Sequence, residues 1–321
     1  MTRGDGRAPR IAAIGLVGWD HVVEVDRYPA LGGYAVVTAT LEAVGGTTAN
    51  SAAAARRLGA RVSLSGLVGD DDTGRIVRDR LHESGIGVDT VGVDPRRPTD
   101  ASTVVVDRGT GERSIFWHQG ARIAKGDRLD IDLLFGGDIL ILDTDDLPLR
   151  RFLSDLPAHT RPNARLLGPL TYLSDVGTID AVEIALRHDV VVGNQREFTE
   201  ITGLPNPDEA LASLRGRLRG ANARLLVMTR GADGATAATV DEITVSRGYT
   251  VQCRDATGAG DAFVGALAFG LASRWPLGDT LRLANAGGAL ATTALGSQAA
   301  HPTLAEARAL AGLDPNGPIG A

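Results

Sequence analysis

The sequence DATGAGDAF occupies Asp255–Phe263 near the C-terminal end of the chain, and an apolar segment with helical spacing follows it. Gly258, Ala259 and Gly260 carry little side-chain bulk, so their backbone N–H groups can approach an anion at the positive end of that helix. Asp261 stands at the expected helix start, where a carboxylate can accept a proton from a hydroxyl group. The stretch predicts an anion site with a base beside it. A glycine-rich turn with Asp261 as an ordinary N-cap is the alternative.

The composition is typical of a soluble globular protein, because 43% of the 321 residues are hydrophobic and 22% are charged. Lys and Arg total 33 against 39 Asp and Glu, so the net charge is -6, and the charges are scattered. This distribution speaks against a nucleic-acid partner. An acidic protein that handles phosphates must rely on local backbone donors and metal ions.

Cys253 is the only cysteine of the chain, so no disulfide can form within it. We interpret Cys253 as a small apolar residue, since no neighbouring His or Lys would activate it. The segment Met1–Arg10 is polar and does not resemble a signal peptide, and no apolar run reaches membrane-spanning length. We therefore expect a cytoplasmic protein with no membrane partner.

Short buried strands alternate with amphipathic helices along most of the chain, which predicts parallel βαβ units with helices on both faces of a sheet. We expect a single domain over residues 1–321. The expected strands are Ile11–Val17, which would deliver Asp20 at its end, Val62–Val68, Ile139–Leu142, Leu166–Leu167, Val190–Val192, Leu225–Met228 and a hairpin of Ala235–Val240 with Ile243–Val245. The expected helices are Ala49–Leu58, Thr73–Glu83, Leu149–Leu156, Thr178–Arg187, Arg196–Thr202, Asp208–Arg219, Ala262–Ser273, Leu277–Ala294 and Leu304–Ala311.

Two β-rich segments, residues 20–44 and about 98–120, interrupt this alternation. They are short, rich in β-branched residues, and carry no helical period. The simplest arrangement joins them in one small sheet that covers the carboxyl ends of the main strands, where open α/β sheets bind ligands. Because only one face of such a lid can cover the site, we also expect a homodimer through the other face.

Five local patterns occur in an order that resembles the ribokinase family of small-molecule kinases, the PfkB carbohydrate kinases. The resemblance extends from about Ile11 to Ala311. It implies a three-layer α/β/α sandwich with a mostly parallel central sheet and a small β-sheet lid. The patterns are Gly45-Gly46 with Asn50, Gly69-Asp70-Asp71, Asn194-Gln195-Arg196-Glu197, Thr229-Arg230-Gly231, and Asp255–Asp261.

The resemblance implies that Asp261 is the catalytic base, which takes the proton of the sugar hydroxyl that attacks the γ-phosphate of ATP. Gly258, Ala259 and Gly260 would form the anion hole for the transferring phosphoryl group. The residues whose positions match the family's contacts to the acceptor hydroxyls are Asp20, Gly45, Gly46 and Asn50, with Asp143 as a further acidic contact.

The resemblance also implies ATP and Mg²⁺ as cofactors. Glu197 with Asn194 would organise the water shell of Mg²⁺, an ion that keeps much of its water when bound. Thr229 and Gly231 would contact the nucleotide, and Asn285 would border the adenine. Asp255 and Thr257 match part of a loop that holds a monovalent cation such as K⁺ in many members.

Several of these residues also have purely structural interpretations. Asp20 could cap a turn, and Asn50 suits a helix N-terminus. Asn194 and Glu197 make a good capping box. A solvated loop and helix start explains Asp70–Asp72 better than a metal cluster does. Trp117 and His118, on the second lid strand, could touch substrate or simply pack the lid.

Departures from the family pattern leave the acceptor open. Gly18 stands where ribokinases usually present Asn, and Thr47 replaces a common Lys, so ribose itself is in question. Ala256 replaces a usual Thr, and Leu166–Pro169 lacks an Asp that often follows that strand. We therefore expect an ATP-dependent kinase of a sugar or sugar-like molecule, with a nucleoside kinase or a non-catalytic sugar or nucleotide sensor as alternatives. A Rossmann dehydrogenase is disfavoured because no G-x-G-x-x-G follows the first strand.

Overall fold

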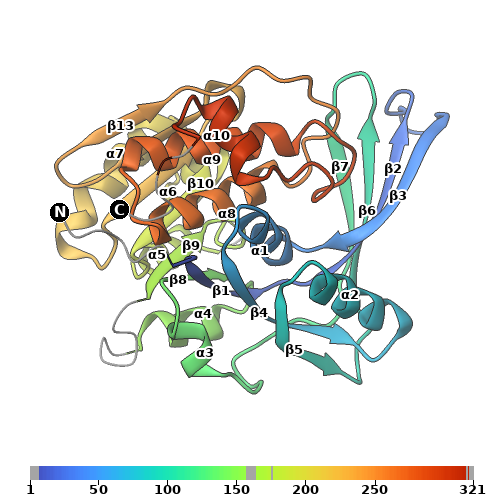
Figure 1. Cartoon of the computed structure of the whole chain (residues 1–321), viewed down its shortest axis with the longest axis horizontal. Helices are drawn as coiled ribbons and strands as arrows, with labels where there is room; N and C mark the ends of the chain where they lie inside the picture. Colours follow the sequence, from blue (N-terminus) through green and yellow to red (C-terminus); the bar gives the residue numbers. More distant parts are fainter. Residues whose placement is uncertain (1–6, 157–163, 175, 316, 318–321) are drawn as a thin grey trace.

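The computed structural model describes residues 7–156, 164–174, 176–315 and 317 (Figure 1). Nine strands form the main sheet in the order β13-β12-β11-β10-β9-β8-β1-β4-β5. Neighbours from β11 to β5 run parallel, whereas β12 is antiparallel to β11 and to β13. The strands are β1 Arg10–Gly15, β4 Arg61–Gly69, β5 Gly87–Asp94, β8 Ile139–Asp143, β9 Arg165–Pro169, β10 Val190–Asn194, β11 Leu225–Thr229, β12 Ala235–Ala238 and β13 Ile243–Ser246.

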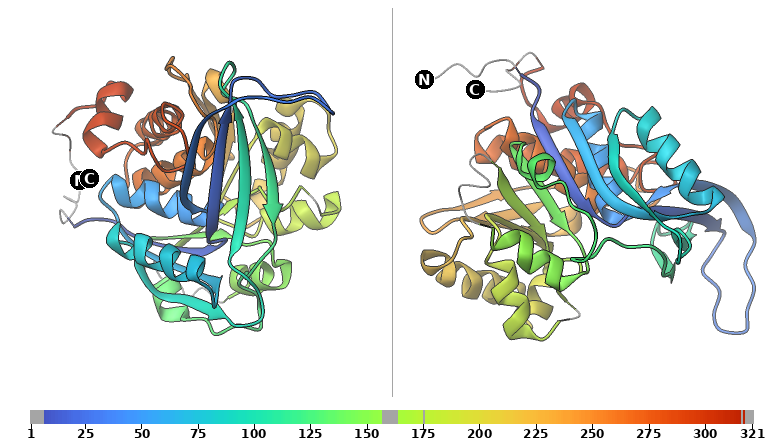
Figure 2. Two further views of the ribbon diagram at one scale, coloured as in Figure 1. Left: turned by 90° about the vertical axis from the view of Figure 1, so that its right-hand side faces the viewer. Right: turned by 90° about the horizontal axis from the view of Figure 1, so that it is seen from below.

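Helices cover both faces of this sheet (Figure 2). Alternate residues of a strand point to opposite faces, and β1 shows this directly: Ile11 and Ala13 pack into one core, Ala12 and Ile14 into the other. The first core includes α1 Thr47–Arg57, α2 Asp72–Glu83, α8 Ala259–Ala272, α9 Leu277–Ala291 and α10 Leu304–Ala311. The opposite face is covered by α3 Ile131–Phe135, α4 Leu147–Ser154, α5 Thr178–Ala185, α6 Gln195–Thr202 and α7 Pro207–Arg217. The predicted three-layer sandwich is confirmed.

A second sheet, which we call the lid sheet, stands beside the sandwich, on the right in Figure 1. Its order is β3-β2-β6-β7, with β2 Gly18–Val25, β3 Val37–Gly45, β6 Asp100–Asp107 and β7 Arg113–His118. The two β-rich segments meet where β2 runs parallel to β6. The predicted small sheet therefore exists, and it is assembled from parts of the chain about 80 residues apart.

The structure corrects three details of the sequence analysis. The first strand ends at Gly15, and Asp20 lies inside β2 of the lid sheet rather than at the end of that strand. Gly258, not Asp261, is the N-cap of α8. Strand β5 and helix α3 were not expected. The β5 segment mixes glycines and aspartates, and it is a strand because it pairs with β4 at the sheet edge.

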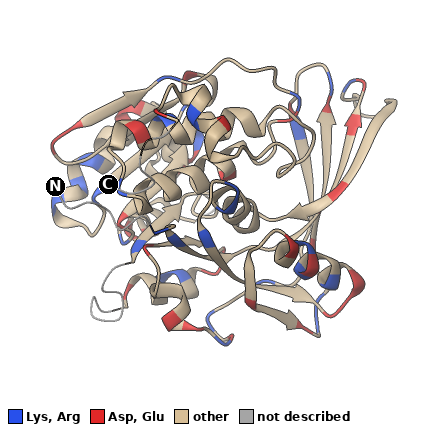
Figure 3. Ribbon diagram, viewed as in Figure 1, with Lys and Arg blue, Asp and Glu red and all other residues tan. Residues whose placement is uncertain are grey.

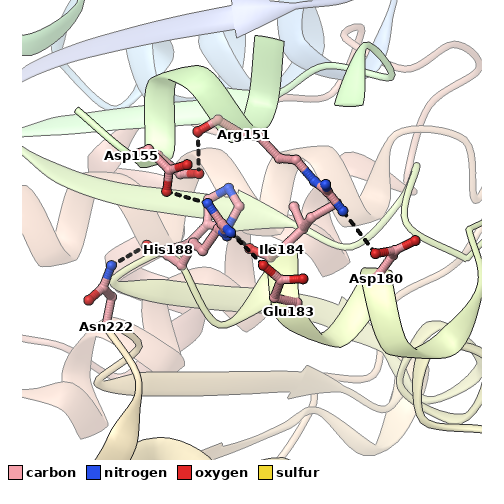
Figure 4. Close-up of polar contacts among 9 residues, drawn as sticks. Arg151, Asp155, Asp180, Glu183, Ile184, His188 and Asn222 are labelled. Carbon is pink, nitrogen blue, oxygen red and sulfur yellow. Dashed lines mark hydrogen bonds and ion pairs between the residues drawn. The ribbon is translucent and has the colours of Figure 1, made fainter. Parts of the chain in front are cut away.

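Ion pairs connect α4 to α5 on the surface of the second helical layer (Figure 4). Arg151 of α4 lies 2.9 Å from Asp180 of α5, and Arg187 pairs with Asp155 and Glu183. Exposed pairs of this kind contribute little stability individually. Elsewhere, Lys and Arg are mixed with Asp and Glu along the ribbon (Figure 3). Across the described part of the chain, every helix is too short or too polar to cross a membrane.

Helices α1 and α8 approach closely because small residues face each other. A Cβ atom added to Gly265 would lie 2.4 Å from the Ser51 carbonyl oxygen and 2.8 Å from the Ala54 Cβ. Gly265→Ala should therefore lower the free energy of unfolding by about 1–3 kcal/mol, the usual cost of overpacking. Urea unfolding monitored by circular dichroism measures this change.

Gly216→Ala is the matched control, because an added Cβ on this exposed α7 position meets no atom within 4 Å. It should raise the free energy of unfolding by about 0.5–1 kcal/mol through helix propensity. Equal effects of the two substitutions would contradict the close approach of α1 and α8.

Candidate active site

A cavity of about 350 Å³ lies between the lid sheet and the carboxyl ends of the central strands. Ligands of open α/β sheets bind at this edge. Its walls come from β2, β6 and β7 of the lid sheet, from the first turns of α1 and α8, and from the ends of β8, β9 and β10. Eleven of the predicted site residues line it: Asp20, Gly46, Asn50, Asp143, Asn194, Glu197, Thr229, Thr257, Gly258, Gly260 and Asp261.

A hydrogen-bond network joins three of these residues across the cavity wall. The Asn50 amide donates to Asp261 Oδ2 at 2.8 Å. Ser297 Oγ donates to Asn50 Oδ1 at 3.1 Å and to Asp20 Oδ2 at 3.4 Å, while Gln298 Nε2 donates to the same Asn50 oxygen at 2.9 Å. Asn50 is thus held with its amide toward Asp261. The sequence analysis missed Ser297 and Gln298, because a Gly-Ser-Gln segment after a helix looks like an ordinary turn.

The first turn of α8 begins after a glycine N-cap and leaves open space beside Gly260. Gly258 adopts φ 77°, a conformation that favours glycine, and an added Cβ would lie 2.7 Å from the Ser297 Cβ. A Cβ on Gly260 would meet no atom within 4 Å, so the backbone there is open to a ligand. The first N–H groups of a helix have no acceptor within the helix. One of these groups, the Ala259 N–H, makes a long hydrogen bond of 3.4 Å to the Ala256 carbonyl oxygen.

Burial raises the pKa of the cavity carboxylates. Loss of hydration is the largest cause for Asp261, whose pKa rises to about 7 despite the Asn50 hydrogen bond, and the charges of Asp143 and Asp20 raise it further. The pKa of Asp20 rises to about 6 and that of Glu197 to about 7, again mainly through burial. A carboxylate that titrates near neutral pH is suited to accept a proton in a reaction.

Asp143 lies at the floor of the cavity, almost completely buried at 1% exposure. Burial raises its pKa, while the Thr47 hydroxyl and the charge of Arg150 act in the opposite direction. Arg150 is itself fully buried and donates to the Pro169 carbonyl oxygen. One oxygen of Asp143, Oδ1, is buried without a hydrogen-bond partner among the described residues.

Thr47, which replaces the expected Lys, lies beside Tyr172. Their hydroxyl oxygens are 3.1 Å apart, and both residues line the cavity. Tyr172, from the turn after β9, had no signal in the sequence, because a single Tyr after a strand is common.

Asn194 and Glu197 form the capping box of α6, as the structural interpretation predicted. Glu197 Oε2 accepts from the Asn194 N–H at 2.8 Å, and Asn194 Oδ1 accepts from the Glu197 N–H at 2.9 Å. Both residues also line the cavity. Glu197 therefore places a carboxylate at the end of the cavity bordered by β10 and β11, and its structural role is compatible with a role in binding.

Five predicted site residues do not line the cavity: Gly45, Ala259, Gly231, Asn285 and Asp255. An added Cβ on Gly45 would overlap the Asp20 carboxylate, so this glycine makes room for Asp20. The Asn285 amide donates to the Ser246 carbonyl oxygen at 3.1 Å and to that of Arg247 at 3.2 Å, which ties α9 to the end of β13.

Asp255 organises the loop before α8. Its carboxylate, fully buried, accepts from the N–H groups of Thr257 and Gly296 at 2.8 Å each. Thr257 Oγ1 is buried without a hydrogen-bond partner in the described part of the chain, so it is available to a cation or phosphate. No group of three or more His, Cys, Asp or Glu among the described residues could hold a metal ion. Cys253, interpreted above as a small apolar residue, is exposed.

Comparison with known proteins decides the family. The model of the pfkB family carbohydrate kinases matches residues 9–304. The chain belongs to this family. The predicted class of enzyme, a carbohydrate kinase with a ribokinase-like fold, is confirmed by this match.

Similar proteins support the assignment over the whole length. An ATP-dependent ribose-1-phosphate kinase from Halopiger xanaduensis is 30% identical over 91% of this chain and 94% of its own length. Probable fructokinase-4 from Arabidopsis thaliana is 28% identical over 89% of this chain and 93% of its own. The structure of Arabidopsis thaliana ribokinase with ribose and ATP shares the fold at 20% identity, with a TM-score of 0.77 over 96% of this chain and all of that one.

The raised pKa of Asp261 predicts a pH-dependent cost to stability. The pKa of Asp261 in the folded protein, about 7, lies above the ordinary value of 3.8, so the folded state holds its proton more tightly than the unfolded state does. The free energy of unfolding therefore falls as pH rises from about 4 to 7. Asp261→Asn removes this cost. The variant should be more stable than the unsubstituted protein at pH 8, by at least about 1 kcal/mol, and the difference should vanish near pH 4.

Urea unfolding at a series of pH values measures this difference. Asp241→Asn, in the exposed turn between β12 and β13, is the control and should show no such pH-dependent gain. A constant difference for Asp261→Asn at all pH values would contradict the raised pKa.

Proposed function

We propose that the chain transfers the γ-phosphoryl group of ATP to a hydroxyl group of a sugar or sugar-like acceptor. The observation that carries this proposal is the position of Asp261, a sheltered carboxylate with pKa about 7 in the first turn of α8. It touches Asn50, which lines the same cavity as Asp20. A proton acceptor thus lies between an anion site and a set of hydroxyl-binding groups.

In the proposed reaction, Asp261 takes the proton of the acceptor hydroxyl as its oxygen forms a bond to the γ-phosphorus. The bond from that phosphorus to the bridging oxygen breaks, and ADP leaves with the electron pair. The N–H groups at Gly258–Gly260 face the charge on the transferring group. The lid sheet excludes water that would otherwise hydrolyse ATP.

The acceptor binds, in this proposal, to Asp20, Asn50, Asp143 and the backbone at Gly45 and Gly46. Support comes from the network that holds Asn50 and from the free Asp143 oxygen. Carboxylate and amide oxygens are suitable partners for neighbouring hydroxyl groups because each can accept a hydrogen bond.

The nucleotide and its metal occupy, in this proposal, the end of the cavity bordered by Asn194, Glu197 and Thr229, with Gly231 and Asn285 farther out. Mg²⁺, when bound, would neutralise the phosphates, and Glu197 would hold it through water. Asp255 and Thr257 would hold a monovalent cation such as K⁺, for which the unpartnered Thr257 Oγ1 is the supporting observation. The cytoplasm is the proposed location.

A nucleoside kinase is the second candidate. Trp117 and Tyr172 line the cavity, and aromatic side chains can stack on a base. The relatives also act on different acceptors, since their names specify ribose 1-phosphate, fructose and ribose. Thr47 and Gly18, which replace the Lys and Asn usual in ribokinases, line the same cavity as Trp117 and Tyr172.

A substrate panel tests the proposed function. The purified protein is supplied with Mg²⁺–ATP and with ribose, fructose, ribose 1-phosphate, gluconate or adenosine, and release of ADP is followed. At least one acceptor should accelerate ADP release, and Asp261→Asn should lower that rate by about 10²-fold or more while ATP still binds. Near-normal turnover of this variant would exclude Asp261 as the base. Sugar binding without ADP formation throughout the panel would favour a sensor.

We also propose a homodimer through the lid sheet. Phe116 of β7 is 53% exposed, and Tyr34 and Val36 just before β3 and Val37 at its start are exposed as well. Large exposed apolar patches often mark association surfaces. Phe116→Asp should therefore shift the protein from dimer to monomer in light-scattering measurements. Ile179→Asp, at an exposed α5 position, should leave the mass unchanged. A monomeric unsubstituted protein would contradict the proposal.

A further inference from the structure

Arg113, the first residue of β7, is the one Lys or Arg among the described residues that line the cavity. Five carboxylates line it too: Asp20, Asp100, Asp143, Glu197 and Asp261. A site that accepts polyphosphate needs positive charge to offset such a set, and the backbone donors of α8 supply only partial charge. Arg113 had no role in the sequence analysis.

The Arg113 guanidinium has no strong partner. Its nearest carboxylate is that of Glu112, at 4.0 Å, and Glu112 is 79% exposed. Such a pair contributes little. No described residue accepts a hydrogen bond from the Arg113 side chain. Arg122 of the adjoining segment differs, because it pairs with Asp145 and lies over the Trp117 ring.

The register of the lid sheet separates Arg113 from the acceptor residues. Arg113, Ile115 and Trp117 are alternate residues of β7, so they share the face that lines the cavity. Trp117 pairs with Ser102, which pairs with Asp20. Arg113 lies four residues from Trp117, about 13 Å along the strand. The backbone of Arg113 is therefore farther from Asp20 than a single sugar bound at Asp20 would extend.

The same end of the lid sheet is attached to the loop that leads into the anion site. The Ala256 N–H donates to the Gly111 carbonyl oxygen at 3.1 Å. Arg254 donates to Glu24 of β2 at 3.0 Å, and Glu24 is buried. Arg113 is two residues from Gly111, and Ala256 is two residues from Gly258. Arg113 therefore extends from the part of the lid sheet that is hydrogen-bonded to the loop before α8.

We propose that Arg113 contacts the transferring phosphoryl group and stabilises its charge during transfer. This inference rests on the proposed kinase function. As the acceptor oxygen bonds to phosphorus and the bond to ADP breaks, negative charge is spread over the three remaining phosphoryl oxygens. The planar guanidinium donates to two such oxygens at once, which Lys cannot do in the same geometry. The proton still goes to Asp261.

Binding of a phosphoryl mimic tests the role of Arg113 without requiring the natural acceptor. Isothermal titration measures the affinity for Mg²⁺–ADP with and without aluminium fluoride, which occupies the place of the transferring group. The unsubstituted protein should bind ADP more tightly with aluminium fluoride. Arg113→Met should lose at least about 10-fold of that enhancement while its affinity for ADP alone stays within about 2-fold. Arg113→Lys should lose less.

Arg108→Met is the matched control, because Arg108 lies in the same β6–β7 hairpin but borders a different surface hollow with Gln252 and Cys253. It should retain the full enhancement. The inference would be overturned if aluminium fluoride increased ADP affinity equally in Arg113→Met and in the unsubstituted protein. It would also be overturned if aluminium fluoride increased ADP affinity in neither protein. An effect of Arg113→Met confined to turnover of ribose 1-phosphate or gluconate would also overturn it, since the cation would then serve an anionic acceptor.

The two proposals fail in different ways. If no acceptor of the panel releases ADP, the kinase proposal fails, yet the aluminium fluoride titration still reports on Arg113. If an acceptor is phosphorylated and Arg113→Met has normal turnover and normal enhancement, only the inference about Arg113 fails.

Discussion

The hydrogen bond from Asn50 to Asp261 joins two helix N-termini that are 211 residues apart in sequence. It exists because α1 and α8 pack closely, with Gly265 against the Ser51 carbonyl oxygen. Side chains any larger at this contact would push the helices apart. The proposed base and the proposed acceptor groups thus share one rigid support, and the geometry of the cavity depends on it.

The cavity concentrates carboxylates in a place from which water is largely removed, and this constraint shapes its surroundings. Burying an isolated charge costs free energy, so burial raises the pKa of a carboxyl group. Neighbouring groups reduce this cost when they supply a hydrogen bond or an opposite charge. Behind Asp143 the fully buried Arg150 provides an opposite charge, and its own pKa falls to about 10, still well above neutral pH. The network of Ser297 and Gln298 orients Asn50. The raised pKa of Asp261 means that the folded protein loses stability when this carboxyl group ionises.

The lid sheet does more than cover the cavity. Its β6–β7 turn and buried Glu24 are attached to Ala256 and Arg254, just before the first turn of α8. The lid sheet is therefore hydrogen-bonded directly to the loop that carries Gly258. This connection would join the proposed exclusion of water to the proposed anion site, and Arg113 lies two residues from it in the sequence.

The sequence alone determined the alternation of strands and helices, the β-rich lid segments and the ordered motifs, because these depend on local periodicity and on residues next to each other. It could not place Asp20, which belongs to the lid sheet because β2 pairs with β3 and β6 rather than extending β1. Nor could it find Ser297, Tyr172 or Arg113. Their roles arise only when distant segments meet around one cavity, and contacts of that kind leave no local pattern. Tertiary structure alone also decided that Asn285 ties α9 to β13.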